Sequence, residues 1–274
     1  MTPSPRHLLL PILALAGCAT TPPATHPLPH RGHAHNDYLH RRPLHDALQH
    51  GFGSVEADVF LVDGELRVGH ERALLGKGTL RSLYLEPLRR RVAERGGRVH
   101  DADQPFVLLV DIKADGADVY PVLRRQLAEY HSMLTVFRDD GCTPGAVTVL
   151  LSGDRPRALV AAESERLCAI DGRPDDLDRA PSPFLVPWIS DAWSRQFGRG
   201  TEDLDADQHA RLTSLIDRAH RQGRQVRFWG APDREEVWAL QRTAGVDWLN
   251  TDRLAALAAW SAANAPAGPQ PATR

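Results

Sequence analysis

Short apolar runs alternate along the chain with longer segments in which apolar residues recur every three or four positions. A nearly continuous apolar run is typical of a strand covered by helices, and the wider spacing is typical of a helix with one buried side. The expected strands are Gly32–His35, Ser54–Leu61, Phe106–Ile112, Ala146–Leu151, Leu167–Ile170, Phe184–Ile189, Gln225–Phe228 and Val246–Leu249. The expected helices are Pro43–His50, Leu80–Arg95, Val119–His131, Arg155–Ala162, Asp205–Arg221, Arg234–Ala244 and Arg253–Ala263.

This alternation predicts an α/β fold whose parallel sheet closes into a (β/α)8 TIM barrel. A length of 274 residues fits one such barrel. A doubly wound open sheet is the alternative architecture. The barrel is favoured because polar residues recur at the ends of the expected strands, where a barrel carries its active site.

Two carboxylates occupy alternate positions of the second expected strand. Glu56 and Asp58 lie two residues apart, so their side chains point to one face, while Val55, Ala57 and Val59 point to the other. Carboxylates on one face repel each other unless a proton or a cation lies between them. Because oxygen ligands suit Mg²⁺ or Ca²⁺, the pair predicts a site for a divalent cation.

The stretch around this strand carries an ordered set of motifs: His33-Ala34-His35-Asn36-Asp37-Tyr38, then Ser54-Val55-Glu56-Ala57-Asp58-Val59, then His70. This set resembles the phosphatidylinositol-phospholipase-C-like phosphodiesterase superfamily, which includes glycerophosphodiester phosphodiesterases. Within it, the set is most similar to the branch called altered inheritance of mitochondria protein 6. Val110-Asp111-Ile112-Lys113 resembles the third acidic strand of that superfamily, and the segment from Gly245 to Asp252 resembles its last strand.

The resemblance implies a phospholipase-C-like TIM barrel and a set of metal ligands, namely Glu56, Asp58, Asp111 and Asn36. Asp111 supplies the third carboxylate, although many members of the superfamily have the longer Glu at this position. Asn36 would add a side-chain carbonyl oxygen, as in the calcium-dependent phospholipases that it resembles.

Other residues are expected to bind substrate. Lys113 lies two positions after Asp111 on the same face of the strand, and its ammonium is expected to bind a phosphate oxygen. Trp229 ends the seventh expected strand and is expected to shape the substrate pocket. Trp193 and Phe197 are further candidates for the pocket, with core packing as their alternative role.

Two histidines are expected to exchange protons with the substrate. Cleavage of a phosphodiester requires one group that takes a proton from the nucleophile and another that protonates the leaving oxygen, and histidine suits both tasks near neutral pH. The spacing to Glu56 favours His35 over His33 as one member of the pair, and His70 is the other. His33 is expected to lie one layer deeper and to be structural.

These residues together predict a metal-dependent phosphoric diester hydrolase that acts on glycerophosphodiesters or (lyso)phospholipids. A metal-dependent amidohydrolase is one alternative, with His33 and His35 as a ligand pair on the first strand. A non-catalytic binding module on the same barrel is another. The presence of both catalytic histidines and all three carboxylates favours the hydrolase.

The first residues have the pattern of an export signal. Arg6 precedes an apolar run, Leu8 to Ala16, that is too short to cross a bilayer, and Leu15-Ala16-Gly17-Cys18 resembles a bacterial lipobox. We therefore expect residues 1–18 to be a lipoprotein signal peptide and lipidated Cys18 to anchor the protein to a membrane in the bacterial cell envelope, facing the periplasm or the exterior. The expected organisation continues with a tether over 19–29, the barrel over 30–263 and a disordered tail over 264–274.

Composition narrows the range of partners. A net charge of −2 provides no basic field, which argues against nucleic acid. We expect a monomer. Cys142 and Cys168 are interpreted as structural thiols, although an oxidising compartment would permit a disulfide between them.

Overall fold

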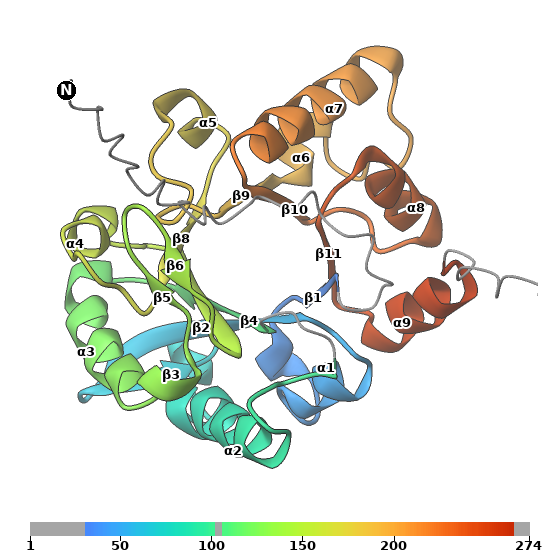
Figure 1. Ribbon diagram of the computed structural model, residues 1–274. Coiled ribbons are helices and arrows are strands. Elements are labelled where there is room, and N and C mark those ends of the chain that lie inside the picture. The colour runs from blue at the N-terminus through green and yellow to red at the C-terminus, as the bar shows by residue number, and fades with distance from the viewer. Residues whose placement is uncertain (1–30, 102–105, 266–274) are drawn as a thin grey trace, which may run out of the picture.

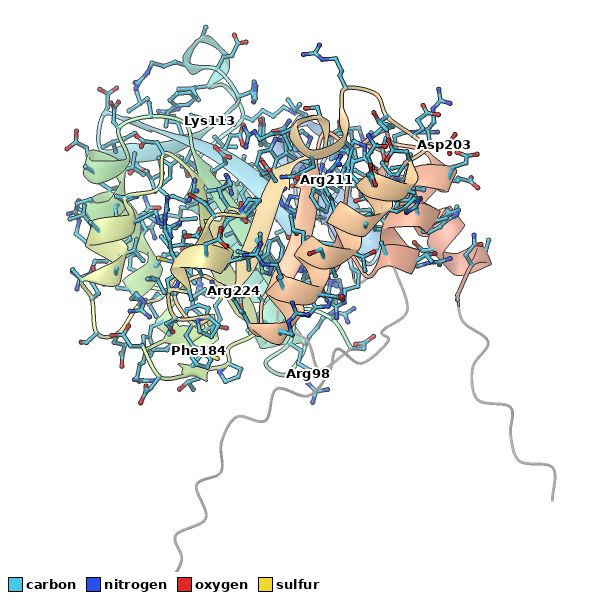
Figure 2. The ribbon with its side chains drawn as sticks, turned by 90° about the horizontal axis from the view of Figure 1, so that it is seen from above. Arg98, Lys113, Phe184, Asp203, Arg211 and Arg224 are labelled. Atoms are coloured by element: carbon cyan, nitrogen blue, oxygen red, sulfur yellow. The ribbon has the colours of Figure 1, made fainter. Side chains whose placement is uncertain are left out.

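The computed structural model describes residues 31–101 and 106–265. Within this part of the chain, eight parallel strands close into a barrel and the helices form a ring outside it, as Figure 1 shows in a view down the barrel. The predicted TIM barrel is thus confirmed. Figure 2 shows the same barrel from the side, with Lys113 near one end and Phe184 near the other.

The strands are β1 Gly32–Ala34, β2 Ser54–Val62, β3 Glu65–Val68, β4 Phe106–Ile112, β5 Val136–Phe137, β6 Cys142–Thr143, β7 Val147–Gly153, β8 Ala169–Gly172, β9 Trp188–Ala192, β10 Gln225–Trp229 and β11 Trp248–Thr251. The helices are α1 His45–Gln49, α2 Glu86–Glu94, α3 Gly116–Ala128, α4 Arg157–Ala161, α5 Asp176–Arg179, α6 Trp193–Phe197, α7 Ala206–Arg221, α8 Glu235–Ala244 and α9 Leu254–Ala263. A single π-helical turn, Arg81–Leu85, leads into α2.

The order of the barrel strands is β1, β11, β10, β9, β8, β7, β4 and β2, and pairing of β1 with β2 closes the ring. Strand β3 pairs antiparallel with the C-terminal part of β2, from Val59 to Val62. Alternate residues of each strand divide between two cores. On β4, Leu108 and Val110 pack outward with the helices, while Val107 and Leu109 pack with Trp188 and others inside the barrel.

Several strands end later than expected. Strand β9 was expected over Phe184–Ile189 but begins at Trp188, directly after Pro187, and continues through Ser190 and Asp191. The apolar pattern ends too early because polar residues occupy the strand ends at the mouth of the barrel. The short elements β3, β5, β6, α5 and α6 were not expected.

Three further expectations concern side chains away from the barrel mouth. Trp193 and Phe197 are buried, and their rings pack on each other and on Phe228. Both residues therefore belong to the core and not to a substrate pocket. Cys142 and Cys168 are both unbridged.

One carboxylate, Asp247, connects three segments at the end of the barrel where the strands begin. Asp247 precedes β11, and its Oδ2 accepts hydrogen bonds from the Val226 backbone N–H at 2.8 Å and from Nε2 of His220 at 2.8 Å. Its Oδ1 lies 3.4 Å from Nη1 of Arg31, next to β1. The hydrogen bond and charge of Asp247 outweigh partial burial and raise the pKa of His220.

This pairing predicts a pH-dependent contribution to stability. A histidine whose folded-state pKa is raised stabilises the protein fully below its unfolded pKa, and the contribution is lost as pH rises through the folded pKa. We therefore expect His220→Gln to lower the free energy of unfolding by about 0.5–1 kcal/mol at pH 5.5 and by less at pH 9. Urea titration at both pH values measures the difference. His209→Gln, an exposed position of the same helix, is the control, and an equal loss for His220→Gln at both pH values would contradict the prediction.

Candidate active site

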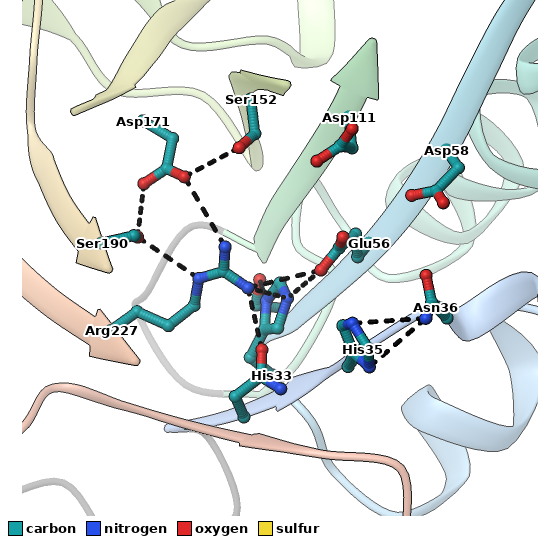
Figure 3. Close-up of polar contacts among 12 residues, drawn as sticks. His33, His35, Asn36, Glu56, Asp58, Asp111, Ser152, Asp171, Ser190 and Arg227 are labelled. Atoms are coloured by element: carbon teal, nitrogen blue, oxygen red, sulfur yellow. Dashed lines mark hydrogen bonds and ion pairs between the residues drawn. The ribbon is translucent and has the colours of Figure 1, made fainter. Parts of the chain in front are cut away.

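Three carboxylates meet inside the barrel at the ends of β2 and β4. Asp58 lies directly opposite Asp111 in the parallel pairing of these strands, and Glu56 lies one interior position below Asp58. One oxygen from each side chain lies within 4.8 Å of the others. Figure 3 shows the carboxylates of Glu56, Asp58 and Asp111 turned toward a common space. The structure thus brings together the three carboxylates that were predicted to bind metal.

Asp58 has two different oxygen environments. Its Oδ2 accepts from the Tyr38 hydroxyl at 2.7 Å and from Nδ1 of His70 at 2.9 Å, and the Lys113 ammonium lies 2.7 Å away. Its Oδ1 is buried and has no hydrogen-bond partner among the described residues. A buried carboxylate oxygen without a donor carries a large desolvation cost. Oδ1 is therefore the oxygen of this side chain that is available to a cation.

Crowding of like charges affects the third carboxylate. Burial and the negative charge of Glu56 raise the pKa of Asp111 to about 6. Lys113 opposes this effect, with its Nζ 3.4 Å from Oδ1 of Asp111. Burial lowers the pKa of Lys113, but the charges of Asp111 and Asp58 outweigh burial and raise it. Lys113 therefore lies within the carboxylate cluster, at its edge nearest the barrel mouth.

Glu56 is held by His33 and Arg227. Its Oε2 lies 3.0 Å from Nε2 of His33 and 3.3 Å from Nη1 of Arg227. Burial raises the pKa of Glu56, but the hydrogen bond with His33 and the charge of Arg227 outweigh burial, so the pKa is lowered. Burial and the charge of Arg227 lower the pKa of His33 to about 4. His33 is therefore neutral and Glu56 is ionised. Nε2 of His33 pairs with Glu56 and also lies 3.0 Å from Nη1 of Arg227, while its Nδ1 pairs with Ser54 Oγ at 2.8 Å.

A buried network continues from Arg227 across the barrel. Asp171 accepts from Ser152 Oγ at 3.0 Å and from Ser190 Oγ, and Nη2 of Arg227 lies 3.6 Å from its Oδ2 (Figure 3). Burial raises the pKa of Asp171, but the charges of Arg227 and Arg173 outweigh burial and lower it. The network fixes Arg227 between two carboxylates, Asp171 and Glu56.

Trp229 ends β10 beside this network. The guanidinium of Arg173 lies 4.8 Å from its ring centroid, and that of Arg227 lies 5.8 Å away. The ring is half-buried. The structure thus places Trp229 at the mouth of the barrel, with one cation from β10 and another that follows β8.

His35 lies directly after β1 and pairs with a carboxylate beyond the last strand. Its Nδ1 lies 2.8 Å from Oδ1 of Asp252. Burial lowers the pKa of His35, but the hydrogen bond with Asp252 and the charge of Glu56 outweigh burial and raise it. The neighbouring Asn36 has a positive φ of 46°, and its Oδ1 lies 2.9 Å from the Tyr38 hydroxyl. Because that hydroxyl has one proton, it donates either to Asn36 or to Asp58 at any one time.

His70 reaches the cluster from a different direction. It follows β3, and the Gly69 backbone N–H donates to the Asp58 carbonyl at 3.1 Å, which holds the end of this hairpin against β2. The side chain of His70 is 55% exposed, whereas Asp58 is fully buried. His70 therefore connects the buried carboxylates with solvent at the barrel mouth.

Two features of this site were not expected from the sequence. One is the hydroxyl of Tyr38, which bridges Asp58 and Asn36. The other is the network of Ser152, Asp171 and Ser190, whose sequence signal was a polar residue at the end of each apolar run. Tyr38 belongs to the motif His33–Tyr38, but its contacts depend on the turn Asp37–Leu39 that follows β1.

Comparison with known protein families matches residues 24–170 to the AIM6-like phosphodiesterase domain. Residues 225–255 match the glycerophosphoryl diester phosphodiesterase family. The chain belongs to the AIM6-like phosphodiesterase family. This result confirms the predicted superfamily and the predicted branch within it.

Named relatives of this AIM6-like domain are fungal. The chain is 30% identical over 252 residues to an altered inheritance of mitochondria protein 6 homolog from Arthroderma benhamiae, with 80% of each chain covered. It is 29% identical over 265 residues to altered inheritance of mitochondria protein 6 from Eremothecium gossypii, with 83% of this chain and 68% of the relative covered.

A solved structure has the same fold as this AIM6-like domain. It is a glycerophosphoryl diester phosphodiesterase from Parabacteroides distasonis, with a TM-score of 0.52 and 13% sequence identity. The match covers 87% of this chain and 88% of that protein. At this identity the likeness shows a shared barrel fold.

The fungal relatives contradict the expected lipoprotein. The prediction of a bacterial signal peptide, a membrane anchor at Cys18 and a location in the bacterial cell envelope is wrong. The prediction relied on a short apolar run followed by a cysteine, a pattern that is not specific. Residues 1–18 lie outside the described residues. Within residues 31–101 and 106–265, every helix is too short or too polar to cross a bilayer.

The buried position of His33 leads to a prediction about stability. We expect His33→Ala to lower the free energy of unfolding by about 2–4 kcal/mol, because it opens a cavity and removes buried hydrogen bonds to Glu56 and Ser54. Chemical denaturation measures the loss, and His131→Ala at an exposed position is the control. Unchanged stability together with loss of bound metal would instead show that His33 is a metal ligand.

Proposed function

We propose that this AIM6-like domain is a metal-dependent phosphoric diester hydrolase that acts on glycerophosphodiesters or (lyso)phospholipids. One observation carries the proposal. Glu56, Asp58 and Asp111 place carboxylate oxygens within 4.8 Å of one another inside the mouth of the barrel. His35 and His70 lie beside this cluster, each hydrogen-bonded to a carboxylate.

The donor set fits a hard divalent cation, Mg²⁺ or Ca²⁺. Both ions prefer oxygen ligands, and the three carboxylates supply negative charge that a cation would offset. The buried Oδ1 of Asp58 has no partner among the described residues, which is the feature expected of a ligand atom. The side-chain oxygen of Asn36 contacts the Tyr38 hydroxyl, and the same hydroxyl contacts Asp58. These four residues are the proposed ligands.

A cation held there supplies positive charge that polarises a phosphoryl group and stabilises charge on its oxygens. Lys113 adds a second positive charge at the edge of the cluster. Its ammonium is free to exchange a carboxylate partner for a phosphate oxygen, because it contacts two carboxylates and is still 21% exposed. Lys113 thereby binds substrate and offsets charge that develops in the transition state.

His35 and His70 move the protons. Each histidine uses Nδ1 to pair with a carboxylate, Asp252 for His35 and Asp58 for His70. This pairing orients each ring, and Nε2 is the nitrogen that exchanges a proton with the substrate. In His35 this nitrogen also lies 3.2 Å from Nδ2 of Asn36, a contact that the substrate would replace. One histidine takes the proton of the nucleophile, which is water or a substrate hydroxyl, and the other protonates the leaving oxygen. Product analysis distinguishes hydrolysis from formation of a cyclic phosphate.

The contacts of His33 argue against the amidohydrolase alternative. That chemistry would require His33 and His35 to bind one metal ion as a pair. Both ring nitrogens of His33 already have partners, Ser54 and Glu56, and its ring is fully buried. The phosphodiester substrate is supported by the families that match residues 24–170 and 225–255.

The ligand assignment predicts loss of metal binding and of activity in the same variants. We expect Glu56→Gln and Asp58→Asn to abolish phosphodiesterase activity and calorimetric binding of Mg²⁺ or Ca²⁺, because each removes one carboxylate from the cluster. Circular dichroism checks that the variants stay folded. Asp203→Asn, at an exposed position, serves as the control. Unchanged metal binding in the double variant would refute the assignment.

The histidine assignment predicts loss of rate without loss of metal. We expect His35→Ala and His70→Ala each to reduce kcat by about 10²–10⁴-fold, the usual contribution of an acid or base. The double variant should fall little below either single variant, because the two residues act in one reaction. Metal content is measured beside the rate. His45→Ala is the exposed control, and an unchanged rate in His70→Ala would exclude His70 from catalysis.

A further inference from the structure

Two arginines follow strands β7 and β8 at the mouth of the barrel, beside the carboxylate cluster. Arg155 lies two residues after β7, and Arg173 directly follows β8. Ser152 on β7 lies opposite Asp111 in the pairing of β7 with β4, and its Oγ lies 3.3 Å from Nη2 of Arg173. Figure 3 shows Ser152 between Asp171 of β8 and Asp111 of the cluster. Because neighbouring strands lie about 4.8 Å apart, a small substrate group is able to span the distance from the cluster to Arg173.

Arg173 has a fixed position and still has hydrogen-bond donors to offer. Its Nη1 donates to Oδ2 of Asp171 at 3.0 Å and to the Gly172 carbonyl at 2.7 Å. Its guanidinium lies 4.8 Å from the ring centroid of Trp229. Its Nε donates to no described residue, and the side chain is 23% exposed. These contacts hold the guanidinium at the barrel mouth and leave part of its donor edge for an anion.

Arg155 is half-buried and pairs with no carboxylate of the described residues. Its Nη1 donates to the Gly153 carbonyl at 2.9 Å, and its Nε is buried without a partner there. The adjacent Asp154 accepts instead from the Gly116 backbone N–H at 2.9 Å. Burial and the positive charge of Arg173 lower the pKa of Arg155. A guanidinium that is partly desolvated beside a like charge is unfavourable, and a bound anion would offset this cost.

The carboxylates around these arginines already have other partners. Asp171 is shared, with Arg173 at 3.0 Å and Arg227 at 3.6 Å. Asp176 pairs with Arg157, which begins α4, at 2.6 Å. The group of arginines that follows β7 and β8 therefore carries excess positive charge, whereas the cluster at the ends of β2 and β4 carries excess negative charge. The mouth of the barrel thus has two electrostatically different halves.

We propose that Arg155 and Arg173 bind a second anionic group of the substrate, a carboxylate or a phosphate on the headgroup. The inference rests on the proposed function, because a scissile phosphate at the carboxylate cluster decides where the headgroup lies. A guanidinium suits either anion, since its paired N–H groups match two oxygens of a carboxylate or a phosphate. The ring of Trp229 keeps Arg173 at the mouth for this contact. The preferred substrates are therefore phosphodiesters with an acidic headgroup.

Substrates that differ by one anionic group test this specificity. Glycerophosphoserine has a carboxylate that glycerophosphoethanolamine lacks, and glycerophosphoglycerol phosphate has a phosphate that glycerophosphoglycerol lacks. We expect kcat/KM of the wild-type chain to be at least about tenfold higher for the acidic member of one pair, which identifies the anion, because charged hydrogen bonds contribute about that much. Arg155→Gln should bring this ratio close to 1, and Arg155→Lys should retain part of it. Arg90→Gln, at a 68% exposed arginine, is the control. Ratios near 1 for the wild-type chain in both pairs, or a ratio that Arg155→Gln leaves unchanged, would overturn the proposal.

Binding of inorganic phosphate tests the two arginines without turnover. In EDTA, which removes divalent cations, we expect calorimetry to show phosphate binding that is at least about tenfold weaker in Arg155→Gln than in the wild-type chain. Arg90→Gln should bind phosphate as the wild-type chain does, and circular dichroism checks folding. Phosphate binding that Arg155→Gln leaves unchanged would overturn the proposal. Phosphate binding that depends on Arg155, together with no cleavage of any phosphodiester, would refute the proposed function and still support the anion site.

Discussion

Three carboxylates that share a buried space repel one another, and the structure of the barrel mouth depends on how that repulsion is offset. Asp58 is fully buried, Glu56 is nearly so, and their oxygens lie within 4.8 Å of those of Asp111. Without compensation, such a group would take up protons. Burial and the negative charge of Glu56 raise the pKa of Asp111 to about 6. The site is therefore electrostatically prepared for a cation.

Compensation comes from two opposite sides of the cluster. Below it, Arg227 and His33 hold Glu56 ionised, and Asp171 holds Arg227 in place. Near the mouth, Lys113 contacts Asp58 and Asp111. The two cations differ in accessibility, because the side chain of Arg227 is 3% exposed and held by the buried network while that of Lys113 is 21% exposed. A locked cation sets the geometry, and a more accessible one is able to exchange partners with a substrate.

The barrel interior thus divides into a polar upper part and an aromatic lower part. His33 lies at the boundary, with Glu56 above it and the edge of the Trp188 ring beside it. A neutral histidine suits this position, because it offers a hydrogen bond upward and an aromatic edge downward without adding a buried charge. The lower part is lined by apolar side chains, among them Leu109, Trp188 and Trp248.

The sequence by itself determined the barrel and most of the candidate site. The spacing and order of the apolar residues predict alternating strands and helices. Glu56 and Asp58 lie two residues apart on one strand, which predicts that they share a face. Both features depend only on neighbouring residues of the sequence. Only the tertiary structure decided which groups meet from distant segments. The pairing of His35 with Asp252, the contact of Tyr38 with Asp58 and the clamp of Asp171 on Arg227 join residues from different strands and loops. Barrel closure and strand register create these contacts, and neither is encoded in the spacing of residues along one segment.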